Sequence, residues 1–435
     1  MNLTRFSLFF PEKREFFLEN QGVFNTGPPI PFLNNRGTLQ DQGPPDIIPF
    51  FSRTIGLDSE TGQPIPILGG IRLSGKIGRN NLGLLNIQSD AQDSGSAASR
   101  KPRSNFSVLR YSREVLSNSA IGVVYLGKEQ GNSSNRIFGS DLTLNFLRKL
   151  DVDGLWLRSV TAGQGAGQAW RAGFTYNSEL MTYQASFLSL SPHFHDELGF
   201  IPRHGVDIFS GHVARHIRPA AYRIIREYRP DVASARFMRR GVGVETNTIS
   251  PTLNIDFADG SLVLLTYRAS EEVLTKQFPI RANYSIAPGR YNFQDWSAEF
   301  QAGGARLLSP NAGYRRGGFW NGQKQGFIAG ARVRISAKLA TSLNFSRDLV
   351  DLPGQSFSTN LVSLRIDNSF STRMALNAFI QYNSVRKEIV SNVRFNFIHH
   401  PLSDLFIVYN ETRPTVGTVS PSRALILKVT HLLSF

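Results

Sequence analysis

Residues 332–339 read Arg-Val-Arg-Ile-Ser-Ala-Lys-Leu, so apolar and polar side chains alternate along the whole stretch. Successive side chains of a β-strand point to opposite faces. One face of this strand would therefore be wholly apolar, while the other would carry Arg332, Arg334 and Lys338. A helix would instead repeat its apolar residues every three or four positions. The stretch predicts a β-strand with one apolar face and one cationic face.

The same alternation recurs at residues 142–146, 253–257, 362–367, 392–397 and 425–435. Clusters of turn residues separate such runs, among them 258–261, 310–313 and 351–354. Strands of about ten residues with unequal connections are typical of transmembrane β-barrels, whereas the strands of soluble sandwiches average about five or six residues. We therefore predict an all-β fold, an antiparallel transmembrane β-barrel over residues 67–435, with about 18 to 20 strands.

The composition excludes several other classes. Among the 435 residues, 48 are Lys or Arg and 33 are Asp or Glu, so the net charge is +15. The longest apolar run covers only residues 405–409, whereas a membrane-spanning helix needs about 20. The absence of cysteine excludes disulfides and thiolate metal sites. Nucleic acid is not an expected partner, because the arginines are spaced along strands and are not clustered in a patch.

The cations are the most informative chemistry in the sequence. If apolar faces meet lipid, eight cations point into the lumen: Arg72, Lys76, Arg332, Arg334, Lys338, Arg365, Arg394 and Lys428. On the lipid side near the midplane each would cost about 2–4 kcal/mol. Inside, they can line a pore that favours anions. Alternatively, lumenal carboxylates such as Asp256 and Asp367 pair with them and leave little net field. The sequence leaves both interpretations open.

Residues 1–66 form a separate segment rich in Phe, Pro and Gly. Only residues 11–20 suit a short helix, with proline in its first turn. We interpret the segment as a periplasmic or lumen-lying lead-in. It is either a plug or a linker that packs its phenylalanines against the periplasmic end of the barrel. A secretion signal is not recognisable, so we expect the start to be truncated.

The end of the chain supports a membrane location. Phe435 closes an alternating strand that also carries Leu433 and Val429 on the same face. A terminal aromatic residue in this setting is similar to the signal read by barrel assembly machinery. That machinery and outer-membrane lipid are therefore the expected partners, and the bacterial outer membrane is the expected location.

Motifs for catalysis, cofactors or metals are weak. Residues 70–76 have the spacing of a phosphate loop, but Ile77 stands where Ser or Thr should hold magnesium. His193, His195, Asp196 and Glu197 could supply metal ligands, although a polar loop that enters a strand also explains them. We predict no cofactor, no metal site and no catalytic residue. Whether the chain is an enzyme stays open.

Several segments resemble the domain-of-unknown-function 5916 family of Gram-negative bacteria. They are RFSLFFPEKREFFLEN at 5–20, PFFSRTIG at 49–56, ILGGIRLSGKIG at 67–78, GLLNIQSD at 83–90, ELGFIPR at 197–203, QYNS at 381–384 and DLFIVYN at 404–410. The resemblance implies an outer-membrane barrel, normally preceded by a signal peptide and a domain similar to family-9 carbohydrate-binding modules. It implies no catalytic residues.

Three hypotheses follow. The first is an outer-membrane barrel that binds or passes a saccharide-related or anionic solute. The second is a cell-surface glycan hydrolase, which would need two carboxylates within about 10 Å of each other. The third is a structural barrel that anchors a partner complex.

Overall fold

The structure is a computed structural model. It describes residues 12, 14–27, 47–58, 64–91, 101–221, 223–281, 284–400, 403–417 and 420–430. No helix in these ranges is long and apolar enough to cross a membrane.

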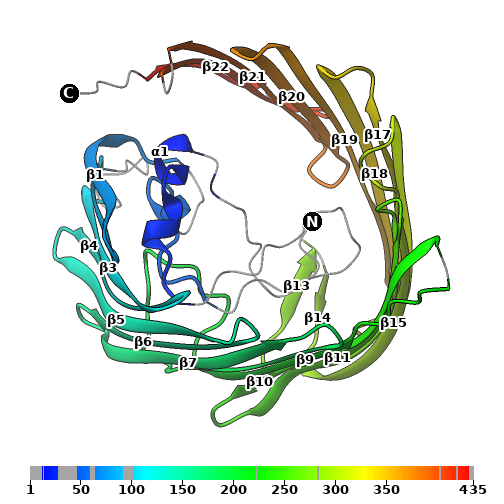
Figure 1. Ribbon diagram of the computed structural model, residues 1–435, viewed down its shortest axis with the longest axis horizontal. Coiled ribbons are helices and arrows are strands. Elements are labelled where there is room, and N and C mark those ends of the chain that lie inside the picture. The colour runs from blue at the N-terminus through cyan, green and yellow to red at the C-terminus, as the bar shows by residue number, and fades with distance from the viewer. Residues whose placement is uncertain are drawn as a thin grey trace.

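A single antiparallel sheet of 21 strands curves into a barrel (Figure 1). Its strands are β1 (Ile67–Ile77), β2 (Asn80–Ser89), β3 (Ser104–Leu116), β4 (Ser119–Gln130), β5 (Ser133–Phe146), β6 (Leu150–Thr161), β7 (Gly165–Asn177), β8 (Met181–Leu190), β9 (Val206–Arg215), β10 (Ile225–Arg239), β11 (Gly243–Phe257), β12 (Leu262–Leu274), β15 (Gly289–Gln301), β16 (Leu308–Phe319), β17 (Gly322–Arg334), β18 (Leu339–Leu352), β19 (Gln355–Ser371), β20 (Met374–Asn383), β21 (Glu388–His400), β22 (Ser403–Pro414) and β23 (Ser422–Val429). The predicted fold class is confirmed, with slightly more strands than the 18 to 20 expected.

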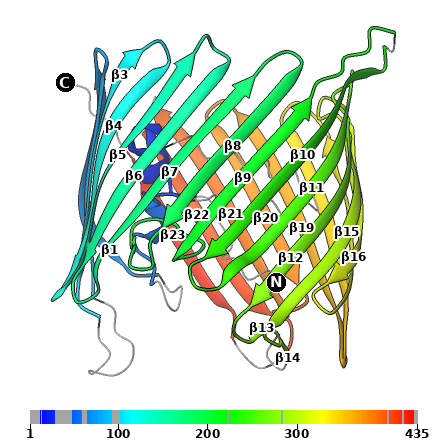
Figure 2. The same ribbon diagram turned by 90° about the horizontal axis from the view of Figure 1, so that it is seen from below.

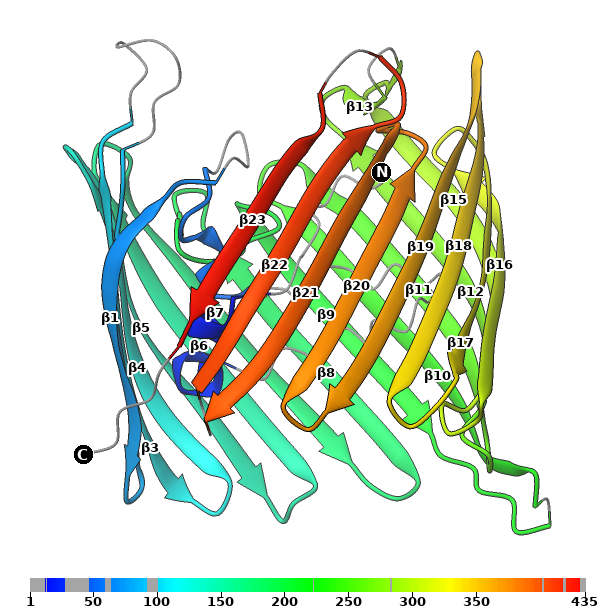
Figure 3. The same cartoon turned by 90° about the horizontal axis from the view of Figure 1, so that it is seen from above.

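Each strand pairs with its neighbour in sequence, and β12 pairs with β15. Since every pairing is antiparallel and the number of strands is odd, β1 and β23 run in the same direction. These two strands are the edges of the sheet, and within the described residues they are not paired with each other (Figure 3).

The two ends of the barrel differ in their connections (Figure 2). One end, the long-loop end, carries the connections 90–103, 191–205, 275–288 and 415–421. The opposite, short-turn end carries mostly tight connections such as 78–79, 117–118 and 372–373, together with longer ones at 216–224 and 302–307, and β23 runs towards it.

Residues that face each other across an antiparallel ladder lie on the same side of the sheet, so the register assigns every side chain to the lumen or to the outside. Leu85 and Ile87 of β2 share a core with Phe24 of the N-terminal segment, which fixes their face as the inward one. The opposite face carries aromatic contacts, such as that of Tyr314 with Phe327, whose ring centroids lie 4.8 Å apart. The outward face is therefore the lipid-facing one.

Several short elements lie in the lumen, on the inner side of the barrel wall. The N-terminal segment contains α1 (Glu15–Leu18), η1 (Gln21–Phe24) and η2 (Ser52–Thr54). The connection after β12 folds into a hairpin of β13 (Phe278–Arg281) and β14 (Tyr284–Ile286) that projects inward in Figure 1. Its Ile280 and Ile286 pack in a core with Trp320. This core closes part of the barrel mouth at the long-loop end.

The prediction of a turn at residues 310–313 is wrong, because these residues lie inside β16. Pro310 pairs there with Ala331 and accepts a hydrogen bond from the backbone of Ala302. It stands near the start of the strand, where the missing N–H of proline costs the ladder least.

Candidate functional site: an inner segment and a cationic wall in the lumen

The N-terminal segment packs inside the barrel against one half of its wall. We call its described residues, 12, 14–27 and 47–58, the inner segment. Phe17, Phe24 and Ile55 are buried among apolar side chains of the inward face. These side chains are Leu85, Ile87, Phe106, Val108, Val124, Leu126, Ile137, Leu155, Leu157, Ala169, Leu188, Leu190, Val206 and Ile208. They come from β2 to β9, and we call them the apolar wall. They explain why the segment lies on this side.

A buried ion pair fastens the inner segment to the wall. Arg110 of β3 donates two hydrogen bonds to Asp141 of β5, at 2.6 and 2.9 Å, and both residues are less than 10 % exposed. Both also reach the segment, since Arg110 donates to the carbonyl of Asn25 at 3.1 Å and Asp141 accepts from the amide of Gly27 at 3.2 Å. We call this arrangement the latch. Such a pair holds only while both charges are present, because either one alone would be buried without compensation.

The latch requires a glycine on the strand between its partners. Gly122 of β4 lies beneath the guanidinium group of Arg110, and a Cβ atom there would stand 2.1 Å from a guanidinium nitrogen. The missing side chain thus makes room for the arginine to cross β4 and reach Asp141. Sequence reasoning missed all three residues, since none belongs to a motif.

A second polar cluster joins the two parts of the inner segment. Glu12 accepts hydrogen bonds from Arg14 and from the hydroxyl of Ser52 at 2.7 Å. Arg14 also donates to the carbonyl of Ile55 at 2.7 Å. Burial alone would raise the pKa of Glu12, but the hydrogen bonds from Arg14 and Ser52 outweigh it and lower the pKa to about 2. The carboxylate is therefore charged at neutral pH.

The loop 191–205 holds the other end of the inner segment. Ile48 and Phe200 exchange backbone hydrogen bonds at 3.0 and 2.8 Å, and the amide of Phe51 donates to Leu198 at 2.8 Å. Beside them, Asp196 accepts from the backbone amide of Leu198, while its Oδ2 atom is buried without a partner among the described residues. Burial raises the pKa of Asp196 well above its usual range. The contact thus carries a carboxyl group for which ionisation is unfavourable.

The histidines of this loop do not form a metal centre. His195 lies against His204 with 5.5 Å between ring centroids, and burial together with that neighbour lowers the pKa of His195. Within the described ranges, no group of three or more His, Asp or Glu side chains is arranged to hold a metal ion. Residues 70–76, with the phosphate-loop spacing, lie inside β1, so they do not form a phosphate-binding loop.

The predicted lumenal cations divide into two groups. Arg72 and Lys76 of β1 stand beside the inner segment and the adjoining wall: Arg72 donates to the carbonyl of Phe16, and Lys76 pairs with Glu114. Five others lie across the lumen on β17 to β23, where the register places them inward. They are Arg332, Arg334, Arg365, Arg394 and Lys428, and we call them the cationic wall.

Members of the cationic wall differ in their partners. Arg365 is paired with Asp367 at 3.0 Å. Arg394 and Lys428 both lie over the ring of Phe406, at 5.0 and 5.5 Å. Arg332 and Arg334 are exposed and have no carboxylate partner among the described residues, although Arg334 donates to a backbone carbonyl. These two side chains therefore reach solvent at the short-turn end of the barrel, where β17 ends.

One predicted lumenal cation, Lys338, does not lie on a strand. The alternation at 332–339 does not continue as one strand, since β17 ends at Arg334 and Lys338 lies in the turn before β18. Ser336 stabilises this turn, because its hydroxyl oxygen accepts hydrogen bonds from the backbone amides of Lys338 and Leu339, both at 3.1 Å. Val429 ends β23, whereas Leu433 and Phe435 lie outside the described residues.

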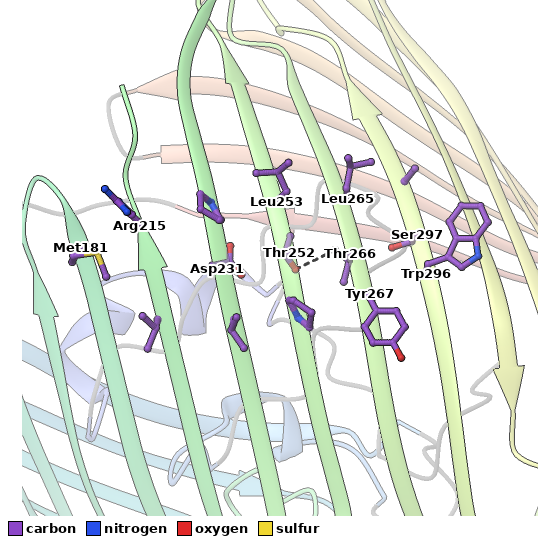
Figure 4. A pocket seen from close by; sticks show the side chains of 15 residues that line it. Met181, Arg215, Asp231, Thr252, Leu253, Leu265, Thr266, Tyr267, Trp296 and Ser297 are labelled. Atoms are coloured by element: carbon purple, nitrogen blue, oxygen red, sulfur yellow. Dashed lines mark hydrogen bonds between the residues drawn. The ribbon is translucent and has the colours of Figure 1, made fainter. Parts of the chain in front are cut away.

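An apolar groove of about 760 Å³ lies across β8 to β15 (Figure 4). Its apolar lining includes Leu253, Leu265 and Trp296, which belong to the outward register. Behind them Thr252 and Thr266 share a hydrogen bond of 3.2 Å. The groove therefore faces lipid and is separate from the lumen.

Fold and lumen together define a large transmembrane β-barrel with an N-terminal segment held inside. Its fold is similar to that of the siderophore receptor PirA from Pseudomonas aeruginosa, with a TM-score of 0.55 and 11 % identity over 82 % of this chain and 74 % of that one. For the siderophore receptor PiuA from Acinetobacter baumannii the TM-score is 0.48 and the identity 9 %, over 84 % of this chain and 80 % of that one. For OccAB3 from Acinetobacter baumannii the TM-score is 0.37 and the identity 10 %, over 67 % of this chain and 92 % of that one. No family model and no curated protein matches the sequence.

Proposed function

We propose that this chain is an outer-membrane barrel that passes small anionic solutes along its cationic wall, beside the docked inner segment. The observation that carries the proposal is the division of the lumen into two halves. The inner segment covers the apolar wall of β2 to β9. The cationic wall stands on β17 to β23, and its Arg332 and Arg334 stay exposed without a carboxylate partner among the described residues.

The charge of this half supports anion passage. Inward carboxylates of the same strands include Asp348, which pairs with Lys324 at 3.3 Å, and Asp367, which pairs with Arg365. Both are thus engaged with other cations and do not neutralise Arg332 or Arg334. Unneutralised arginines that line an aqueous path raise the local concentration of anions.

The orientation follows from the connections. Outer-membrane barrels have short turns on the periplasmic side and longer loops outside. We therefore place the short-turn end in the periplasm and the long-loop end outside the cell. In the domain-of-unknown-function 5916 family, which the sequence resembles, the barrel is normally preceded by a domain similar to family-9 carbohydrate-binding modules, which makes a saccharide carrying an acidic group a candidate solute.

The test is conductance of the refolded chain in a planar bilayer under a salt gradient. We expect stable steps whose reversal potential indicates anion selectivity. The variant R332Q/R334Q should lower the anion-to-cation permeability ratio by at least about twofold, since it removes the unpaired charges of the wall. The matched control is R113Q/R136Q, which removes two exposed arginines from the outward face.

Two results would contradict the proposal. One is cation selectivity, or selectivity that R332Q/R334Q and R113Q/R136Q change equally. The other is silence from protein that migrates as a folded, heat-modifiable barrel. In that case the inner segment would close the lumen, and an anchoring role would be the better account.

A further inference from the structure

The outward face carries arginines near the long-loop end that no part of the lumen uses. Arg158, Arg236, Arg316 and Arg347 are exposed, and each lies towards the long-loop end of its strand. None has an ion-pair partner among the described residues. Other outward arginines at this end are neutralised: Arg136 pairs with Glu129, and Arg413 and Arg423 share Glu411. The four unpaired charges therefore need an explanation.

Their neighbours locate these arginines in the membrane. Each stands directly across the ladder from an aromatic residue. The pairs are Arg158 with Phe138, Arg236 with Phe209, Arg316 with Trp296 and Arg347 with Phe327. Aromatic residues gather at the two interfaces of a barrel. An arginine that faced lipid at the midplane would cost about 2–4 kcal/mol, but at the interface the cost falls to between about 0 and 1. The arginines thus lie at the level of lipid headgroups.

Two of them flank the apolar groove of Figure 4. Trp296, the cross-strand neighbour of Arg316, lines the groove on one side. Val232 of β10 lines the part of the groove nearer to β8 and β9, and Arg236 follows on the same strand towards the long-loop end. The strands β10 and β16 are separated by four ladder spacings, roughly 19 Å, and Arg236 lies four residues beyond the row of Arg316, so the two residues are roughly 23 Å apart. Two cations this far apart above a wide apolar groove fit a lipid with a broad headgroup and several acyl chains.

We propose that this site binds a phosphorylated glycolipid of the outer leaflet. Its phosphates would lie on Arg236 and Arg316, and one of its acyl chains would occupy the groove lined by Leu253 and Leu265. Arginine suits this task because its planar guanidinium binds phosphate through two parallel hydrogen bonds. The inference rests on the transmembrane fold and on the proposed orientation, and it does not depend on solute passage.

The probe is bis-phosphorylated lipid A, added to the full chain in detergent and followed by native mass spectrometry. We expect bound lipid A on the wild-type protein and binding at least about tenfold weaker to its dephosphorylated form. The variant R236Q/R316Q should bind lipid A at least about tenfold more weakly than the wild type. The control R113Q/R136Q, which removes the same charge from the outward face away from the groove, should bind like the wild type.

Equal binding of the two lipid forms to the wild type would overturn the proposal without any variant. Equal binding of lipid A to R236Q/R316Q and to the control would overturn the assignment of these residues. Heat-modifiable migration checks that each variant is folded. Conductance of the same preparations tells this failure apart from failure of the proposed function, because neither outward variant touches the cationic wall.

Discussion

Replacing Asp141 by asparagine should release the inner segment from the wall. The carboxylate accepts two bonds from Arg110 and one from the amide of Gly27. Asparagine keeps the shape but leaves the arginine charge buried and unpaired, which costs about 3–5 kcal/mol in comparable sites. We take the lower end, about 3 kcal/mol, because Arg110 still donates to the carbonyl of Val123. Since about 1.4 kcal/mol is a factor of ten, the undocked fraction should rise about 100-fold.

Thiol labelling of a single reporter measures that fraction. The chain has no cysteine, so Thr26→Cys introduces the only thiol. Thr26 is buried between the two residues that contact the latch, and its hydroxyl has no hydrogen-bond partner among the described residues. The substitution therefore removes no contact of the side-chain oxygen. When undocking is fast relative to labelling, the labelling rate is proportional to the undocked fraction.

The control for this experiment breaks an exposed ion pair. Arg136→Gln removes the outward pair with Glu129, where both side chains are about half exposed and the expected effect is below about 1 kcal/mol. Its labelling rate should stay within about fivefold of the parent. If Asp141→Asn labels no faster than Arg136→Gln, the latch does not hold the inner segment and the reasoning is refuted.

Three further predictions concern the same docking. Gly122→Ala places a methyl group where the guanidinium of the latch lies, so it should accelerate labelling of the Thr26→Cys reporter as Asp141→Asn does; a normal rate would show that the guanidinium has room to move. Hydrogen bonds lower the pKa of Glu12 from its ordinary value of 4.5 to about 2. The stability that the charged Glu12 gives to the docked inner segment is therefore complete above pH 4.5 and is lost as the pH falls towards 2. Labelling with a pyridyl disulfide, which reacts in acid, should accelerate over that range, and Glu12→Gln should abolish this acceleration. Burial raises the pKa of Asp196, so its neutral form is favoured at low pH and the docked loop weakens as the pH rises through that pKa. Asp196→Asn should therefore slow cleavage by trypsin after Arg203 at pH 8. At acid pH, where pepsin replaces trypsin, the variant and the parent should be cleaved in this loop at the same rate.

Alternation predicted the barrel because it records the one physical difference that every strand experiences, lipid on one face and water on the other. Arg332 and Arg334 could be placed inward from their spacing alone, and the register agrees. Lys338 could not, since the same alternation continues through a turn that Ser336 forms with its hydroxyl. Local pattern does not separate a strand from a short serine turn when both alternate.

The inner segment was harder to place, although a signal for its docking site exists. Residues 155–157 read Leu-Trp-Leu, so β6 is apolar on both faces here: Leu155 and Leu157 are buried inward, and Trp156 is exposed outward. Strands that face water on the inside do not need this pattern. Apolar residues on both faces of β2 to β9 thus indicate an inner layer, but the pattern cannot say which segment provides it.

The two halves of the lumen have different physical requirements, which explains how one chain can carry both. The apolar wall is stable only when the inner segment covers it, since otherwise residues such as Leu126 and Ile137 would face water inside the barrel. The cationic wall has the opposite requirement, because Arg332 and Arg334 keep their charge at little cost only while water reaches them. An inner segment that filled the whole lumen would desolvate these arginines, and a segment that left it would expose the apolar wall. Docking of the described inner segment on one side satisfies both conditions at once, because it covers the apolar wall and leaves Arg332 and Arg334 exposed.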